Sequence, residues 1–142
     1  MLFTPEKSLC EKKQAVVVSR DKGSPREHRA TNPDRKFDLR HYQLDGDLFK
    51  QTKCCDFLLI NDSHRKAYLI ELKGRKIDDA VDQLEAAEQK CKAELQDYIF
   101  FYRIVCSKAK THRIQSSKFL KFKEKCGNRL LVRENSCPET LK

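Results

Sequence analysis

Two carboxylates and a lysine stand where apolar strand residues are expected. Asp56 precedes the apolar run FLLI, and Glu71 lies inside the run AYLIEL, with Lys73 two positions further on. A turn at residues 62–65 would pair the two runs as antiparallel strands and place Asp56 directly opposite Glu71. Like charges at opposed positions destabilise a strand pair, so a nearby cation must compensate. Lys73 is one such cation, and a bound divalent metal ion is the other.

The chemistry that fits this pair is metal-assisted hydrolysis of a phosphodiester. Mg²⁺ in proteins takes one or two carboxylates, several waters and substrate phosphate oxygens. A metal ion held there neutralises the attacked phosphate and lowers the pKa of a bound water. Lys73 could orient or deprotonate that water, or stabilise developing negative charge. We therefore expect Mg²⁺ or Mn²⁺ as the cofactor; the alternative is a charged sheet face at an edge, held by an ion pair within the sheet.

An Asp in one strand, followed by Glu-x-Lys in the next strand and then a helix, resembles the signature of the PD-(D/E)XK nuclease superfamily, here in a small member of bacterial or phage type. The pattern stands as Asp56 and then Glu71-Leu72-Lys73, and the resemblance covers residues 43–106. It implies an α/β fold in which a central mixed β-sheet is flanked by helices, the restriction-endonuclease-like core. It also implies that Asp56, Glu71 and the carbonyl of Leu72 bind the metal and that Lys73 is the catalytic lysine.

Two further residues enter through the same resemblance. Gln83 resembles a glutamine that some branches use near the site, and its place at the edge of a helix's apolar stripe lets it reach the sheet. Many branches also supply an acid from upstream in the chain. Asp45 is our candidate for this additional metal ligand, ahead of Asp38, although the Asp45-Gly46 pair is itself typical of a tight hairpin turn. Cys55 stands where the motif has proline.

The elements that must position these residues follow from hydrophobic periodicity. Apolar residues at steps of three and four predict a helix over 77–95, and a run of aromatic and β-branched residues predicts a buried strand over 98–106. Ser116 or Ser117 would cap a short second helix that Gly127 ends. The expected elements are an edge strand at 14–18, a hairpin within 39–51, strands at 54–61, 66–73, 98–106 and 129–133, and helices at 77–95 and 116–126, with residues 19–36 and the C-terminal tail as polar loops.

Side chains alternate along a strand, so the two central strands present two different faces. One face carries Asp56, Leu58, Leu69, Glu71 and Lys73, and the other carries Phe57, Leu59, Tyr68, Ile70 and Leu72. We expect the second face to form the core and the acidic pair to lie on the other side of the sheet.

The net charge is +9, and residues 107–133 hold nine basic residues against one acid. A basic surface attracts polyanions, so we expect nucleic acid, either DNA or RNA, as the partner. In the helix at 116–126 the apolar residues would dock on the sheet and leave the lysines outside. The expected phosphate-binding residues are Lys108, Lys110, Arg113, Lys118, Lys121, Lys123 and Lys125. A merely solvated basic surface is the alternative.

The 142 residues fit one domain, with an N-terminal region (1–36), the motif core (37–106), and the basic helix with the final strand (107–142). The seven cysteines include no C-x-x-C pair, so we expect free thiols in the reducing cytoplasm rather than zinc ligands. No apolar run is long enough to span a membrane, and the first residues do not resemble a secretory signal. The four histidines have no partner spacing, and we interpret none of them as a ligand or a base.

These features together predict a small metal-dependent nuclease. They leave its oligomeric state open, and a homodimer is one of the alternatives. One alternative is a nuclease-like fold without catalysis that binds nucleic acid or a protein; the lack of an evident third acid favours it. The other alternative is an interaction protein with no affinity for polynucleotides.

Overall fold

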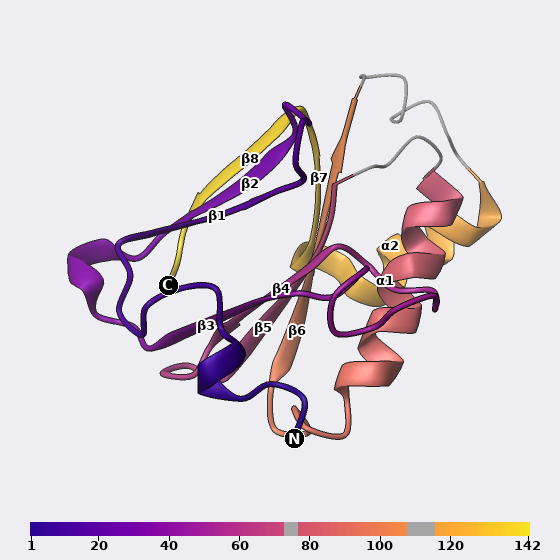
Figure 1. Cartoon of the computed structure of the whole chain (residues 1–142). Helices are drawn as coiled ribbons and strands as arrows, with labels where there is room; N and C mark the ends of the chain where they lie inside the picture. The colour runs from indigo at the N-terminus through magenta and orange to yellow at the C-terminus, as the bar shows by residue number, and fades with distance from the viewer. Residues whose placement is uncertain (73–76, 108–115) are drawn as a thin grey trace.

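The protein folds into two β-sheets and two α-helices. The structure is a computed structural model, and it describes residues 1–72, 77–107 and 116–142. Along the chain the elements are η1 (Pro5–Lys7), β1 (Val16–Arg20), β2 (Glu27–Thr31), η2 (Pro33–Arg35), β3 (Leu39–Gln43), β4 (Phe57–Asn61), β5 (Lys66–Glu71), α1 (Ile77–Cys91), β6 (Ile99–Cys106), α2 (Ser117–Cys126), η4 (Gly127–Arg129), β7 (Leu130–Glu134) and β8 (Ser136–Thr140). The larger sheet has five strands in the order β3-β4-β5-β6-β7, and the smaller has the order β1-β2-β8 (Figure 1).

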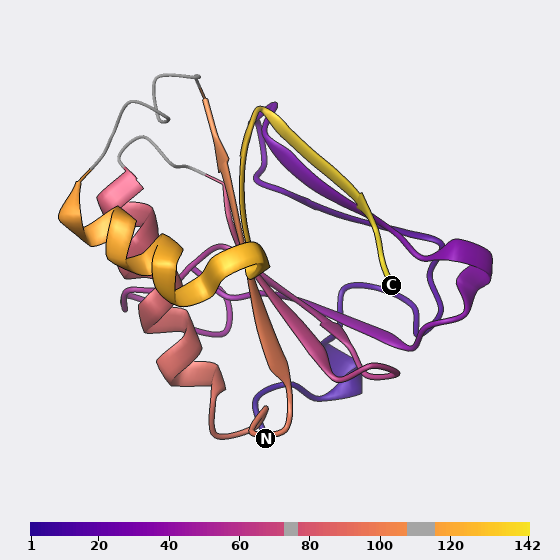
Figure 2. The same cartoon turned by 180° about the vertical axis from the view of Figure 1, so that it is seen from behind.

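Both sheets are mixed, which confirms the predicted α/β class. In the larger sheet β4 pairs antiparallel with both β3 and β5, whereas β6 pairs parallel with both β5 and β7. Helix α1 lies between β5 and β6 in the chain, and α2 lies between β6 and β7. Figure 2 shows that both helices cover one face of the larger sheet and that the smaller sheet lies on the other face. Within the described residues no helix has the length and apolar character needed to cross a membrane.

The two faces of the larger sheet are both buried, so the prediction of a single core face was wrong. On the face toward the helices, Leu58, Ile60 and Leu69 pack with the apolar stripe of α1. On the opposite face, Phe57, Leu59, Tyr68, Ile70 and Leu72 pack with residues of the smaller sheet, among them Val17 and Ala30. The sheet is sandwiched because β2 and β8, which the sequence pattern did not predict, supply a second covering layer. The acidic pair therefore lies on a face that is itself a core.

The helices follow their sequence signals closely. In α1 the buried residues are Ile77, Ala80, Val81, Leu84, Ala87 and Cys91, with two acids in the first turn. Regular helix ends at Cys91 rather than at residue 95, and buried Leu95 follows in a turn. In α2 the Ser116 hydroxyl accepts a hydrogen bond from the Phe119 amide at 3.1 Å, and Gly127 ends the helix with a φ of +57°. The predicted cap and stop of α2 are confirmed.

Two local predictions in the N-terminal part were wrong. Residues 27–31 form the central strand of the smaller sheet rather than a loop, and they were missed because four of the five residues are polar or charged. The Asp45-Gly46 pair does not join a hairpin, since β3 pairs with β4 across residues 44–56. Instead, Gly46 has a φ of +82° in a local turn closed by the Phe49 amide on the Leu44 carbonyl at 2.9 Å.

A polar network joins the two sheets. Arg103 on β6 donates to both carboxylate oxygens of Glu139 on β8, at 2.7 and 3.0 Å, and His28 on β2 contacts the same carboxylate at 2.5 Å. Burial alone would raise the pKa of Glu139, but the hydrogen bonds from His28 and Arg103 outweigh burial and lower that pKa to about 2. Glu139 is therefore ionised at neutral pH, and it neutralises Arg103 inside the interface.

His41 makes the inter-sheet layer sensitive to acid. Burial lowers the pKa of His41 to about 4, from about 6.5 in an unfolded chain. A base with a lowered folded-state pKa stabilises the fold fully above pH 6.5, and this contribution is lost as the pH falls toward 4. We expect the free-energy difference between wild type and His41→Gln to shrink by about 2 kcal/mol between pH 7.5 and pH 5. Urea unfolding of both proteins at the two pH values measures this, and an unchanged difference would contradict it.

Candidate functional site

The register of β4 and β5 places the two acids side by side. Asn61 pairs with Lys66 and Phe57 with Ile70, which is the register predicted from the turn at 62–65. The ladder continues one position further, because the Asp56 amide donates to the Ile70 carbonyl at 3.0 Å. The carboxylate of Asp56 in turn accepts from the Leu72 amide at 2.8 Å. Asp56 and Glu71 are therefore neighbours across the strand pair, as predicted.

Both carboxyl groups are withdrawn from solvent. Asp56 is 7% exposed and Glu71 is 6% exposed, so they are not part of a solvated charged face. Burial raises the pKa of Glu71, the negative charge of Asp56 raises it further, and it reaches about 9. Burial also raises the pKa of Asp56. Two acids that lie this close together in a buried site do not both ionise unaided, so the pair shares a proton at neutral pH.

Two more carboxylates flank the pair. The charges of Asp45 and Asp21 each raise the pKa of both Asp56 and Glu71, so both lie within electrostatic reach. Asp45 follows Leu44, whose amide donates to the Asp56 carbonyl at 2.9 Å. Asp21 follows β1 directly and was not predicted; its only sequence signal is its place just after the run VVVSR. Negative charge thus converges from four separate segments of the chain.

The contacts of Leu72 and Gln83 differ from what the resemblance implied. The Leu72 carbonyl, expected as a metal ligand, accepts a hydrogen bond from Nε of Arg26 at 2.6 Å. Gln83 reaches from α1 to the sheet side as expected, but its carbonyl oxygen accepts from the Cys54 amide at 3.3 Å. Gln83 thereby fixes the chain two residues before Asp56 rather than extending the acidic group. Arg26, like Asp21, comes from a segment that was predicted to be a polar loop and from which no site residue was expected.

Four of the predicted site residues lie outside the described part of the chain. They are Lys73, Lys108, Lys110 and Arg113. The other predicted basic residues lie on α2, where Lys118, Lys121, Lys123 and Lys125 are exposed and Phe122 and Cys126 are buried. This arrangement of the helix matches the prediction. Lys118 forms an ion pair with Asp82 of α1 at 3.0 Å, so three of these four lysines are the stronger candidates to meet a phosphate backbone.

The donor set of the acidic pair fits a hard divalent cation. It consists of carboxylate oxygens, which Mg²⁺ and Mn²⁺ prefer. Oε1 of Glu71 is buried and has no hydrogen-bond partner among the described residues. A buried oxygen without a partner costs free energy, and a coordinated cation removes that cost. Asp56 and Glu71 are therefore a candidate two-carboxylate metal site, near which Asp45 and Asp21 add further negative charge.

A different group meets a stricter distance criterion for metal binding. In residues 1–72, 77–107 and 116–142, His28, Cys137 and Glu139 are the group of three whose ligand atoms all lie within 4.8 Å of one another. Both oxygens of Glu139 already bind Arg103, and one of them also contacts His28. We therefore assign this group to the packing between the sheets. It also corrects the reading of His28 as a residue in a polar loop, because its side chain is fully buried.

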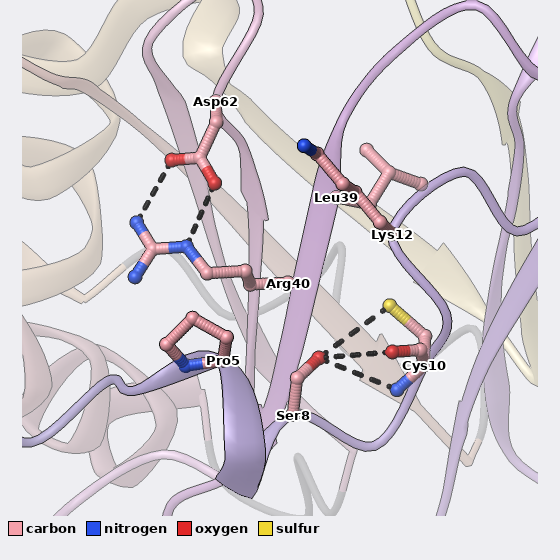
Figure 3. A pocket seen from close by; sticks show the side chains of 7 residues that line it. All are labelled: Pro5, Ser8, Cys10, Lys12, Leu39, Arg40 and Asp62. Atoms are coloured by element: carbon pink, nitrogen blue, oxygen red, sulfur yellow. Dashed lines mark hydrogen bonds and ion pairs between the residues drawn. The ribbon is translucent and has the colours of Figure 1, made fainter.

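The pocket in Figure 3 lies at the far end of β4 from Asp56. It has a volume of about 240 Å³ and is lined by Pro5, Ser8, Cys10, Lys12, Leu39, Arg40 and Asp62. Arg40 holds Asp62 through two hydrogen bonds of 2.7 and 2.8 Å, and the Ser8 hydroxyl bonds to Cys10. Arg40 and Asp62 thus satisfy each other, and Lys12 forms an ion pair with Asp38 at 4.0 Å, so we assign no catalytic role to this pocket. All seven cysteines are free thiols, as predicted.

Comparisons with known proteins give no independent assignment. No model of a protein family, no characterised protein and no solved structure matches the chain. The geometry of the site therefore carries the functional argument.

Proposed function

We propose that the protein is a metal-dependent nuclease of the PD-(D/E)XK type that hydrolyses phosphodiester bonds of nucleic acid. The observation that carries this proposal is the buried, opposed pair of Asp56 and Glu71. Such a pair is costly to maintain, and a structural role gives no reason to keep it. The antiparallel β3-β4-β5 unit, followed by α1 and the parallel strand β6, is consistent with a restriction-endonuclease-like core.

The roles of the residues follow from their contacts. Asp56 and Glu71 hold the cation, Gln83 holds the chain before Asp56 in position, and the Leu72 amide orients the Asp56 carboxylate. Mg²⁺ or Mn²⁺ bound there supplies charge neutralisation at the phosphate and a water of lowered pKa. Lys73, two residues beyond Glu71 in the sequence, is the expected partner of that water. The net charge of +9 and the lysines of α2 favour a polyanionic substrate.

One observation favours the second candidate, a nuclease-like fold that binds nucleic acid or a protein without cleaving it. Asp45 and Asp21 do not join Asp56 and Glu71 in a group of ligand atoms within 4.8 Å among the described residues. A site with two carboxylates holds a cation less tightly than one with three. A cleavage assay that includes a variant of Asp56 separates the two candidates.

Wild-type protein is expected to cleave DNA or RNA when Mg²⁺ or Mn²⁺ is added and to stop when EDTA is added. Asp56→Asn should lower the rate by about a hundredfold or more, because it removes a metal ligand whose charge is needed for the reaction. The matched control is Asp47→Asn, an exposed aspartate in the turn after β3, which should cleave at the wild-type rate. Equal cleavage by Asp56→Asn and wild type would reject the proposed site. Binding of nucleic acid without cleavage by any protein would support the second candidate.

A further inference from the structure

The turn between β1 and β2 is an ordered structure beside the acidic pair. The Ser24 amide donates to the Asp21 carbonyl at 3.1 Å, and the Arg26 amide donates to the Ser24 hydroxyl at 3.2 Å. Gly23 has a φ of +77°, which lets the chain reverse tightly. Figure 1 shows this turn at the same end of the molecule as the end of β5, where Glu71 lies. The turn at residues 21–26, which belongs to the smaller sheet, therefore lies beside the candidate site; we call this turn the arm.

Arg26 is the residue through which this arm touches the site. Its Nε donates to the Leu72 carbonyl at 2.6 Å, while the Leu72 amide donates to the Asp56 carboxylate at 2.8 Å. Leu72 therefore links Arg26 and Asp56, because its carbonyl accepts from Arg26 and its amide donates to Asp56. A half-buried guanidinium fixed through Nε has lost much of its freedom, and its two terminal nitrogens form no hydrogen bond with the described residues, so their donors remain for a ligand.

The charge of Arg26 is not neutralised by the described part of the chain. Its neighbours Arg20 and Arg29 both form ion pairs with Glu27, whereas Arg26 forms none with residues of the three described ranges. The ionised acids nearby repel a polyanion, so a nucleic acid that enters the site needs a fixed cation close to the cleaved bond. Lys22, exposed in the same turn, adds to the positive charge there.

We propose that Arg26 binds a phosphate of the nucleic acid next to the bond that is cleaved; the inference rests on the proposed nuclease function. The planar fork of an arginine matches two phosphate oxygens, and anchoring through Nε sets its direction in advance. The arm then binds the substrate, and the strands β2 and β8 serve to hold Arg26 beside the carboxylates.

The test measures binding separately from cleavage. Fluorescein-labelled DNA and RNA oligonucleotides, single- and double-stranded, are titrated with the Glu71→Gln protein, which does not cleave, at several salt concentrations. Adding Arg26→Met should weaken binding about tenfold and lower the slope of log affinity against log salt by about one, since one phosphate contact is lost. Arg26→Lys should keep the slope and lose part of the affinity. Arg35→Met, at the opposite end of β2, is the matched control and should change neither quantity.

The outcomes distinguish the two proposals. If Arg26→Met lowers the unfolding free energy but leaves affinity and salt slope unchanged, Arg26 only ties the sheets together and the inference is overturned, while the nuclease proposal stands on the cleavage assay. If wild-type protein neither binds nor cleaves any of the probes, both proposals fail.

Discussion

Replacing Glu71 by Gln is expected to stabilise the protein at pH 8 and, at the same time, to abolish the proposed metal-dependent cleavage. The pKa of Glu71 is about 9 in the folded protein, against 4.5 for an ordinary Glu side chain. An acid with a raised folded-state pKa stabilises the fold fully below pH 4.5, and this contribution is lost as the pH rises through 9. The amide of Gln keeps the shape of the side chain without this pH-dependent cost.

The expected gain is on the order of a few kcal/mol at pH 8, because each pKa unit corresponds to about 1.4 kcal/mol. Urea unfolding between pH 5 and pH 9 should show a steep loss of stability in wild type and a flatter profile in Glu71→Gln. Mg²⁺ should raise the Tm of wild type at pH 8, because an ion that binds only the folded state stabilises it, and should leave the Tm of the variant unchanged.

The control for this prediction is Glu6→Gln, which removes one negative charge from an exposed position in η1. It should keep the wild-type pH profile and the wild-type cleavage rate. A Glu71→Gln protein that is less stable than wild type at pH 8 would show that Glu71 is ionised and satisfied in the fold. A structural ion pair would then replace the metal site as the explanation.

Replacing Arg103 by Met is expected to cost about 3–5 kcal/mol of unfolding free energy. The substitution keeps most of the apolar stem but leaves the Glu139 carboxylate in the interface with His28 as its remaining partner. It also removes the donors to the Tyr102 and Arg129 carbonyls at 3.0 and 2.9 Å. The loss is large because a buried charge without its counter-charge is costly, whereas the pair itself contributes little net stability.

Urea unfolding at pH 7 measures this cost. Arg133→Met is the matched control, since Arg133 is exposed on the neighbouring strand β7 and its side chain donates to the adjacent Val132 carbonyl at 3.0 Å; it should cost less than about 1 kcal/mol. Adding Glu139→Gln to Arg103→Met should recover part of the loss, because the unpaired charge is removed. If Glu139→Gln recovers none of the unfolding free energy that Arg103→Met loses, then packing, and not the charge pair, holds the two sheets together.

The part of the site that could be predicted from the sequence is the part fixed by local patterns. The position of the turn at 62–65, together with the alternation of side chains, was enough to place Asp56 opposite Glu71, because strand pairing across a short turn leaves one register. The stripe of α1 and the cap of α2 are equally local signals. The strand register, the stripe and the cap are each determined by residues that lie close together in the sequence.

The part that could not be predicted depends on pairing between distant segments. Strand β2 lies between β1 and β8, and its parallel partner begins at Ser136, more than a hundred residues away. The sequence of β2, EHRAT, has no apolar alternation because its buried residues include His28 in the inter-sheet network. Asp21 and Arg26 were missed for the same reason, since only the formation of the smaller sheet brings their turn to the end of β5.

The pairing of β2 with β8 also sets an order of events during synthesis. A ribosome completes β3, β4, β5 and α1 well before it reaches residues 136–140, so the acidic pair can assemble on a partial chain. The β1–β2 hairpin alone is a two-stranded unit of marginal stability and needs β8 beside it to persist. The contact between Arg26 and Leu72 therefore becomes permanent only when the last strand is made. A nascent chain would therefore carry the opposed carboxylates before the contact between Arg26 and Leu72 is fixed.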